Sequence, residues 1–146
     1  MKALLAGGTG FTGSRALALM LERGHGVTCL LRPESDAGAL HEGDVNVVRG
    51  TLEDAVTLGG HLAGHDALVS AGPLTPDTAS GIVEAARSAG VERVIVIGTT
   101  SIFTNLNARS KVRKTEAESA IRESGLDYTV LRPTMIYGTH EDRNMC

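Results

Sequence analysis

The sequence predicts a doubly wound α/β domain, in which helices cover both faces of a parallel sheet. Short apolar segments alternate along the chain with segments whose apolar residues recur at helical spacing. A turn with three evenly spaced glycines follows the first apolar segment. Glycine accounts for 18 of the 146 residues, against an average share of about 7 %, which is typical of a chain with many tight turns. The length indicates one domain.

The first unit runs from a buried strand at residues 2–6 through the glycine turn into a helix at residues 13–23. Gly7, Gly10 and Gly13 permit unusual dihedral angles, close approach of the backbone to a pyrophosphate, and close packing of the helix on the strand. Free N–H groups at the helix start, with the positive end of its dipole, hold an anion. The turn therefore predicts a phosphate cradle, and a merely tight strand-to-helix turn is the alternative.

The remaining elements continue the alternation. Strands are predicted at residues 27–31, 45–48, 67–72, 93–97 and 128–133, and helices at residues 55–63, 76–89 and 110–124. The polar segment 38–44 predicts at most a short helix, and residues 134–146 predict a loop. Because crossovers between parallel strands are right-handed, the six strands are expected in the order 3-2-1-4-5-6 of a Rossmann-type sheet.

Arg32 follows the second strand, where a dinucleotide fold meets the adenosine ribose. An arginine at this place pairs with the 2′-phosphate of NADP, whereas an acidic residue favours the free 2′-hydroxyl of NAD. Arg32 therefore favours NADP, with NAD as the alternative cofactor. The nearby Glu34 and Asp36 weaken the positive charge of such a site. A solvated arginine at a strand end is the other interpretation.

Three further strand ends carry candidate site residues. Asp54, beyond the third strand, can cap the next helix or accept a hydrogen bond from an adenine amino group, and capping is favoured. Ala71 and Gly72 end the fourth strand, where small residues let a cofactor lie against it. The hydroxyls of residues 99–101 follow the fifth strand, at the edge where open α/β sheets place their chemistry. Caps and turns are the alternative role for these hydroxyls.

The helix at residues 110–124 is strongly charged. Its pairs Lys114–Glu118 and Glu118–Arg122 are four residues apart and predict a solvated face with ion pairs along the helix. Lys111 lies outside these pairs and needs a separate explanation.

Composition excludes several classes of function. A formal charge of −3 and an aromatic content of 3 % argue against nucleic acid as a partner. Cys29 and Cys146 give no disulfide or metal-site spacing, which favours a reducing compartment. No apolar run approaches the roughly 20 residues of a membrane helix, and the chain begins directly with a strand. We therefore expect a cytoplasmic protein without a membrane or metal partner.

Five segments of the sequence together resemble one family. They are GGTGFTGS at 7–14, LLRP at 30–33, VERVIVIGTTS at 91–101, SK at 110–111 and SGLDYTVLRPTMIYG at 124–138. They resemble the extended or atypical short-chain dehydrogenase/reductases, in particular the nucleoside-diphosphate-sugar epimerase-like and nitrogen-repression-regulator-like branch. The resemblance covers essentially all 146 residues.

The resemblance implies a role for each matching position. Thr100, within one residue of Thr99 or Ser101, matches the catalytic serine or threonine of the family. Lys111 matches the lysine that binds the nicotinamide ribose and lowers the pKa of a catalytic tyrosine. The residues implied to bind the cofactor are Gly7, Gly10, Phe11, Thr12, Gly13, Arg32, Leu52, Ala71, Gly72, Lys111 and Thr134, with Met135 also near the nicotinamide.

Two departures from the family bear on function. Asn107 stands four residues before Lys111, where the family has tyrosine, and an amide is no general acid or base at neutral pH. Extended members also continue into a further strand and a small substrate lobe. We therefore expect residues 1–146 to form a dinucleotide-binding domain without that lobe, with a flank that would meet another copy or a partner chain.

Three functions remain open at this point. The first is an NADP-dependent oxidoreductase or sugar-nucleotide epimerase-like enzyme that uses Thr100 and Lys111. The second is a non-catalytic dinucleotide-sensing regulator, which Asn107 favours. The third is an inactive truncated fragment of such an enzyme. The sequence names no substrate.

Overall fold

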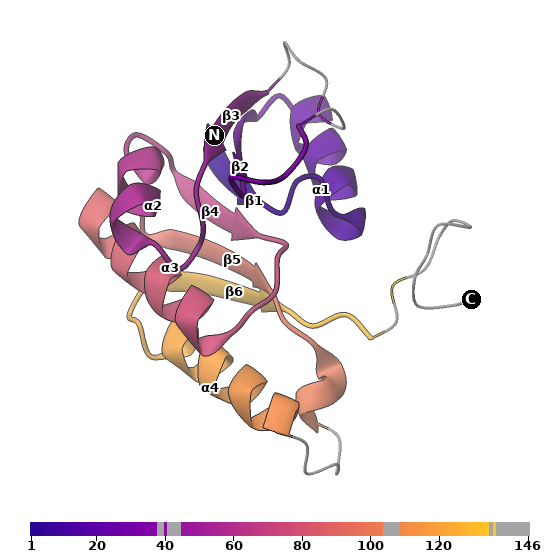
Figure 1. Ribbon diagram of the computed structural model, residues 1–146, viewed down its shortest axis with the longest axis vertical. Helices are drawn as coiled ribbons and strands as arrows, with labels where there is room; N and C mark the ends of the chain where they lie inside the picture. Colours follow the sequence, from indigo (N-terminus) through magenta and orange to yellow (C-terminus); the bar gives the residue numbers. More distant parts are fainter. Residues whose placement is uncertain (38–39, 41–44, 104–108, 135, 137–146) are drawn as a thin grey trace.

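The computed structural model describes residues 1–37, 40, 45–103, 109–134 and 136, and it shows one parallel sheet of six strands (Figure 1). The strand order is β3-β2-β1-β4-β5-β6, which confirms the predicted wiring. The strands are β1 (Lys2–Ala6), β2 (Gly26–Leu31), β3 (Asn46–Arg49), β4 (Ala67–Ser70), β5 (Arg93–Ile97) and β6 (Asp127–Leu131). The helices are α1 (Phe11–Glu22), α2 (Ala55–Leu62), α3 (Pro76–Ala89), α4 (Arg109–Arg122) and the short 3-10 helix η1 (Thr100–Phe103).

Most predicted boundaries differ from the observed ones by one or two residues; β4, for example, ends at Ser70 and not at Gly72. α1 begins at Phe11, two residues before the prediction, because Gly10 already serves as its N-cap. β6 ends at Leu131, before Pro133, which has no N–H to donate to a neighbouring strand. Residues 100–103, for which the sequence predicted no helix or strand, form η1. Apart from Leu40, Thr134 and Ile136, the segments predicted at 38–44 and 134–146 lie outside the described residues.

Helices lie on both faces of the sheet, with α1 on one side and α2, α3 and α4 on the other (Figure 1). Side chains alternate between the two faces of a strand, so Leu4 of β1 packs in the core beneath α2–α4 and Leu5 packs in the core beneath α1. Both side chains are fully buried, and burial of one such leucine is worth about 1.5–3 kcal/mol. The fold is thus stabilised by two separate cores.

Cys29 belongs to the core beneath α1 and is a free, buried thiol. Burial raises the pKa of Cys29 to about 11, so the side chain remains a neutral thiol at physiological pH and packs as a small apolar residue.

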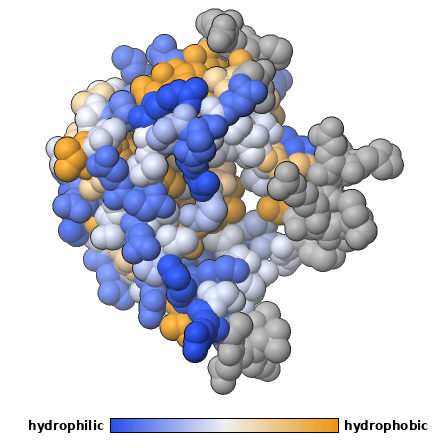
Figure 2. Space-filling view, in the orientation of Figure 1, coloured by the Kyte–Doolittle hydropathy of each residue, from blue (hydrophilic) through white to orange (hydrophobic). Residues whose placement is uncertain are grey.

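The two edge strands are the least covered. β3 and β6 are mostly exposed along their length, in contrast to the buried β1, β2 and β4. Figure 2 shows hydrophilic residues over most of one face, with smaller apolar areas among them. Met1 and Val47 are among the exposed large hydrophobic side chains. No helix of the described part of the chain is long and apolar enough to cross a membrane.

The predicted solvated face of α4 is wrong for Glu118. This residue is buried, and its Oε2 accepts a hydrogen bond from Nε of Arg132 at 2.8 Å and lies 2.7 Å from Nη2 of the same guanidinium as an ion pair. Among the described residues neither Lys114 nor Arg122 pairs with it. α4 packs so that Glu118 faces the end of β6, and that packing decides which cation the carboxylate meets.

Candidate functional site

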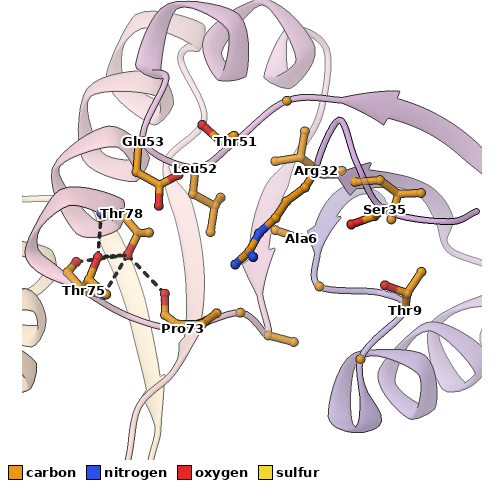
Figure 3. A pocket seen from close by; sticks show the side chains of 17 residues that line it. Ala6, Thr9, Arg32, Ser35, Thr51, Leu52, Glu53, Pro73, Thr75 and Thr78 are labelled. Carbon is orange, nitrogen blue, oxygen red and sulfur yellow. Dashed lines mark hydrogen bonds between the residues drawn. The ribbon is translucent and has the colours of Figure 1, made fainter.

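A cavity of about 450 Å3 opens where the loops after β1, β2, β3 and β4 come together (Figure 3). Parallel pairing places the ends of these strands beside one another, as Ala6 pairs with Leu30 and Ser70, and Leu31 with Arg49. This is the carboxyl edge of the sheet, where doubly wound folds bind ligands. The lining residues are Ala6, Gly7, Thr9, Gly10, Leu30, Leu31, Arg32, Ser35, Gly50, Thr51, Leu52, Glu53, Ala71, Gly72, Pro73, Thr75 and Thr78.

The glycine turn forms one wall of the cavity, and at two of its positions the backbone leaves no room for a larger residue. Gly7 has φ of +84°, and a Cβ there would lie 3.0 Å from the backbone of both Ala71 and Gly72. A Cβ on Gly13 would lie 1.9 Å from the carbonyl oxygen of Gly7. The turn is therefore as tight as the glycine spacing predicts, and only glycine fits at these two places.

The start of α1 points to anion binding. Gly10 caps the helix but offers no side chain to the N–H groups of the first turn. Thr9 and Gly10 line the cavity beside this turn, and the predicted residues Phe11 and Thr12 are its first two helical residues. Backbone donors at a helix start, without a capping side chain, form a site that a pyrophosphate can occupy.

Arg32 extends toward the middle of the cavity (Figure 3). Within the described part of the chain its guanidinium makes no hydrogen bond or ion pair. Ser35, which sequence reasoning missed, lines the same wall. A guanidinium that enters a cavity without an internal partner among the described residues is suited to bind an anionic group.

The opposite wall comes from the loops after β3 and β4. Leu52 is 8 % exposed and supplies an apolar surface next to Thr51 and Glu53. Thr75 and Thr78 line the cavity and cap α3 through a reciprocal capping box. The small residues Ala71 and Gly72, which were predicted as the end of the fourth strand but follow its last residue Ser70, complete this wall.

Asp54 has the capping role that was favoured for it. Its Oδ1 accepts from the N–H of Thr57 at 3.1 Å and its Oδ2 from the Thr57 hydroxyl at 2.6 Å, at the N-terminus of α2. The hydrogen bonds from Thr57 lower the pKa of Asp54 below its usual value. The carboxylate that reaches the cavity belongs instead to its neighbour Glu53.

The residues that were expected near the nicotinamide lie outside the cavity. Thr100 begins η1, and its N–H and its hydroxyl both lie 3.4 Å from the carbonyl oxygen of Pro133. Lys111 lies half-buried in the first turn of α4, and Thr134 is exposed after β6. None of these three residues lines the cavity. Asn107 and Met135 lie outside the described residues.

Lys114 contributes a contact that sequence reasoning missed. Its Nζ lies 3.4 Å from the hydroxyl of Ser101, which connects α4 to η1 near the end of β5. In the described segments of the chain no group of His, Cys, Asp and Glu side chains is arranged to hold a metal ion.

The structure thus brings together six of the predicted residues on one cavity. These are Gly7, Gly10, Arg32, Leu52, Ala71 and Gly72. The lining residues that were not predicted are Ala6, Thr9, Leu30, Leu31, Ser35, Gly50, Thr51, Glu53, Pro73, Thr75 and Thr78. Thr51 and Pro73 each lie within three residues of a strand end, so strand position alone could have identified them.

Comparisons with known proteins agree with this geometry. A family model described as NAD(P)H-binding matches residues 7–145. The photosystem II assembly factor Ycf39 of Trieres chinensis is 26 % identical over 148 residues, which cover 94 % of this chain and 46 % of that protein. The NAD(P)H azoreductase of Xenophilus azovorans is 28 % identical over 135 residues, 89 % of this chain and 46 % of that protein. The chain spans about half the length of these curated relatives.

A solved structure gives the same fold. A wide-type short-chain dehydrogenase/reductase from Veillonella parvula, in complex with NADP, superposes with a TM-score of 0.81 at 20 % identity. The match covers 96 % of this chain and 72 % of that one. At this identity the likeness supports the architecture of the sheet and helices.

Proposed function

We propose, from the premise that this chain belongs to the NAD(P)H-binding family, that its cavity binds NADP(H) in preference to NAD(H). The chain is the NAD(P)-binding part of a reductase- or epimerase-like protein. The preference for NADP(H) rests on one observation. The guanidinium of Arg32 enters the cavity and has no internal partner among the described residues. The 2′-phosphate of NADP is the group that would supply that partner.

The remaining residues place the rest of the dinucleotide. The turn from Gly7 to Gly13 would hold the pyrophosphate through backbone N–H groups at the start of α1. Leu52, Ala71 and Gly72 line the same cavity; Leu52 would supply an apolar surface for the adenine, and the two small residues would leave room for the rest of the cofactor. Thr100, Lys111 and Thr134 form the nicotinamide end, where Lys111 binds the ribose. The bound cofactor supplies or accepts a hydride.

Binding of the two cofactors can be measured by nucleotide fluorescence. We expect the chain to bind NADPH at least tenfold more tightly than NADH. Arg32→Ala should weaken NADPH binding by about 10–100-fold, because a hydrogen bond to a charged group contributes about 1.5–3 kcal/mol. NADH binding should change little. The control is Arg23→Ala, which removes an exposed arginine from the far end of α1.

Two results would reject the proposal. Absence of binding to either nucleotide would remove the cofactor assignment. An equal loss of NADPH and NADH affinity in the Arg32 variant would remove the 2′-phosphate contact.

For the chemistry, we propose a reductase in which Thr100 orients a carbonyl and Lys111 anchors the cofactor. A dinucleotide-sensing regulator is the second candidate, because Asn107 replaces the tyrosine that resembling enzymes use as proton donor. Screening ketones, quinones and sugar nucleotides with NADPH separates the two. Turnover that is unchanged in Thr100→Ala and Lys111→Ala would remove these residues from the mechanism, and turnover of no substrate class would favour the regulator.

We also propose that residues 1–146 form a dinucleotide-binding domain and that other parts of the protein, or another chain, select the substrate. The edge strand β6 supports this proposal, because Tyr128 and Leu131 are 38 % and 52 % exposed on the flank of the sheet. An exposed apolar flank favours association. Sedimentation at increasing concentration should show a second copy binding, and Leu131→Lys should weaken it; a monomer at all concentrations would contradict self-association.

A further inference from the structure

Arg49, the last residue of β3, reaches behind the loop that carries Arg32. Its Nη1 lies within hydrogen-bond distance of three backbone carbonyl oxygens of that loop: those of Arg32 at 3.1 Å, Pro33 at 2.9 Å and Ser35 at 3.0 Å. The register pairs Arg49 with Leu31, the last residue of β2, so the side chain crosses to the segment that directly continues the neighbouring strand. One side chain thus contacts three of the four residues from 32 to 35.

The Arg49 guanidinium contacts backbone carbonyl oxygens rather than an acidic side chain. Within the described residues Arg49 forms no ion pair, and it does not line the cavity. The backbone carbonyl oxygen of Arg49 also lies in hydrogen-bond contact with Nε2 of His61 in α2, at 3.1 Å. The backbone of Arg49 is therefore anchored as well as its side chain. Arg49 therefore links α2 and β3 to the loop after β2, and its contacts are with the loop backbone, outside the cavity.

The loop held in this way presents two cavity residues, Arg32 and Ser35. The N–H of Ser35 also bonds the carbonyl oxygen of Arg32 at 3.0 Å, which closes the turn. A loop that already has its binding conformation loses less conformational freedom when a ligand arrives. A planar guanidinium with several donors is suited to hold several carbonyls in a fixed arrangement.

We infer that Arg49 is a positioning residue that determines selectivity for the 2′-phosphate, by holding residues 32–35 so that Arg32 and Ser35 face the bound nucleotide. This inference rests on the proposed preference for NADP(H). It predicts that loss of Arg49 acts on the phosphate-bearing cofactor and leaves the common part of the two cofactors unaffected.

The test is Arg49→Met, with NADPH and NADH affinities measured by nucleotide fluorescence at low and high salt. We expect the ratio of the two dissociation constants to fall about tenfold, with NADH binding almost unchanged. Amide hydrogen exchange in residues 32–36 should become faster. Arg87→Met is the matched control, because Arg87 also donates to a backbone carbonyl, that of Ser124, but lies away from the cavity.

The outcomes separate this inference from the proposed function. A wild-type chain that binds neither nucleotide, or both equally, rejects the proposed NADP(H) preference and with it this inference. A wild-type preference for NADPH that persists unchanged in Arg49→Met rejects the positioning role alone. Salt also screens the contact between Arg32 and the phosphate, so each variant is compared with the wild type at the same salt concentration; a loss of selectivity with unchanged amide exchange in residues 32–36 also rejects the positioning role. If Arg49→Met unfolds, Arg49→Gln retains a planar donor and should give an intermediate loss of selectivity.

Discussion

The ends of β1–β4 and the ends of β5–β6 carry the two halves of the predicted site, and they differ in how their polar groups are used. At the first half, Arg32 extends into a cavity without an internal partner among the described residues. At the second half, the hydroxyl of Thr100 lies 3.4 Å from the carbonyl oxygen of Pro133, and the buried Glu118 pairs with Arg132 through Oε2, while its Oε1 has no hydrogen-bond partner among the described residues. Arg32 is exposed, so water solvates its guanidinium until a ligand replaces that water, and its position in the cavity indicates where an anionic group can bind.

The contrast also concerns what holds each half together. The glycine turn depends on close backbone contacts, in which Gly7 and Gly13 leave no room for a Cβ. The half at β5–β6 depends on side chains, since the guanidinium of Arg132 holds Glu118 and lies 5.6 Å above the ring of Phe103. Substitutions in the first half should therefore destabilise the protein through steric overlap. Substitutions in the second half should destabilise it through loss of the ion pair between Glu118 and Arg132.

The largest effect is expected at Gly13. Gly13→Ala places a Cβ 1.9 Å from the Gly7 carbonyl oxygen, a contact that the backbone cannot relieve without moving α1. We expect a loss of about 3 kcal/mol or more in the free energy of unfolding, measured by urea denaturation. Nucleotide binding should be lost together with it.

Gly60→Ala is the matched control for this variant. Gly60 lies inside α2, and a Cβ there would meet nothing within 4 Å. The substitution should stabilise the protein by about 0.5–1 kcal/mol, because alanine favours helix. Equal effects of the two variants would show that the turn is not sterically special.

A smaller effect is expected from the ion pair of the second half. Glu118→Ala leaves Arg132 without its carboxylate and should cost about 2 kcal/mol, which is below the full value for a buried pair because the side chain of Arg132 is 34 % exposed. The relative affinity for NADPH and NADH should not change, since neither residue lines the cavity. Denaturation and nucleotide titration of the same variant measure both.

A double-mutant cycle tests whether the two residues act as a pair. The destabilisation by Glu118→Ala and Arg132→Ala together should be clearly less than the sum of the single effects. Additive effects would show that the contact between Glu118 and Arg132 does not contribute to stability. The second half of the site would then not depend on a side-chain ion pair.

The smallest effect is expected at Asp54. Its hydrogen bonds from Thr57 lower its pKa in the folded state, so its contribution to stability is present above the unfolded value near 3.8 and is lost as the pH falls through the folded value. The melting temperature of Asp54→Ala should be below that of the wild type at pH 7, and the two should converge below about pH 4.

Asp54→Asn is the control, because asparagine caps helices but does not titrate. This variant should stay close to the wild type at pH 7 and lack the part of the pH dependence that comes from Asp54. A difference between Asp54→Ala and the wild type that is constant with pH would contradict the role of the ionised carboxylate.

Features set by local backbone geometry could be predicted from the sequence. The spacing of Gly7, Gly10 and Gly13 predicted the turn, because a tight strand-to-helix connection has few solutions and glycine meets them. Asp54 was predicted as a cap for the same reason, since a cap acts within one helical turn. The order of the six strands followed from the alternation of elements and the handedness of crossovers.

Features that depend on which elements meet in space could not be predicted in this way. Lys114, Glu118 and Arg122 have the spacing of surface ion pairs, but α4 turns Glu118 inward to Arg132, which is 14 residues further along the chain. The contact of Arg49 with residues 32–35 has the same origin, because it spans up to 17 positions in the sequence. No local pattern contains such a contact.

The sequence by itself thus determined the class of fold, the tight glycine turn, and the position of Arg32 directly after the second strand. These depend on backbone conformation and on position along a strand, which short stretches of chain encode. Only the tertiary structure decided which charged side chains are solvated, which are paired inside, and which face the cavity. Those outcomes depend on the packing of β3 beside β2 and of α4 against β6, and packing is a property of the whole domain.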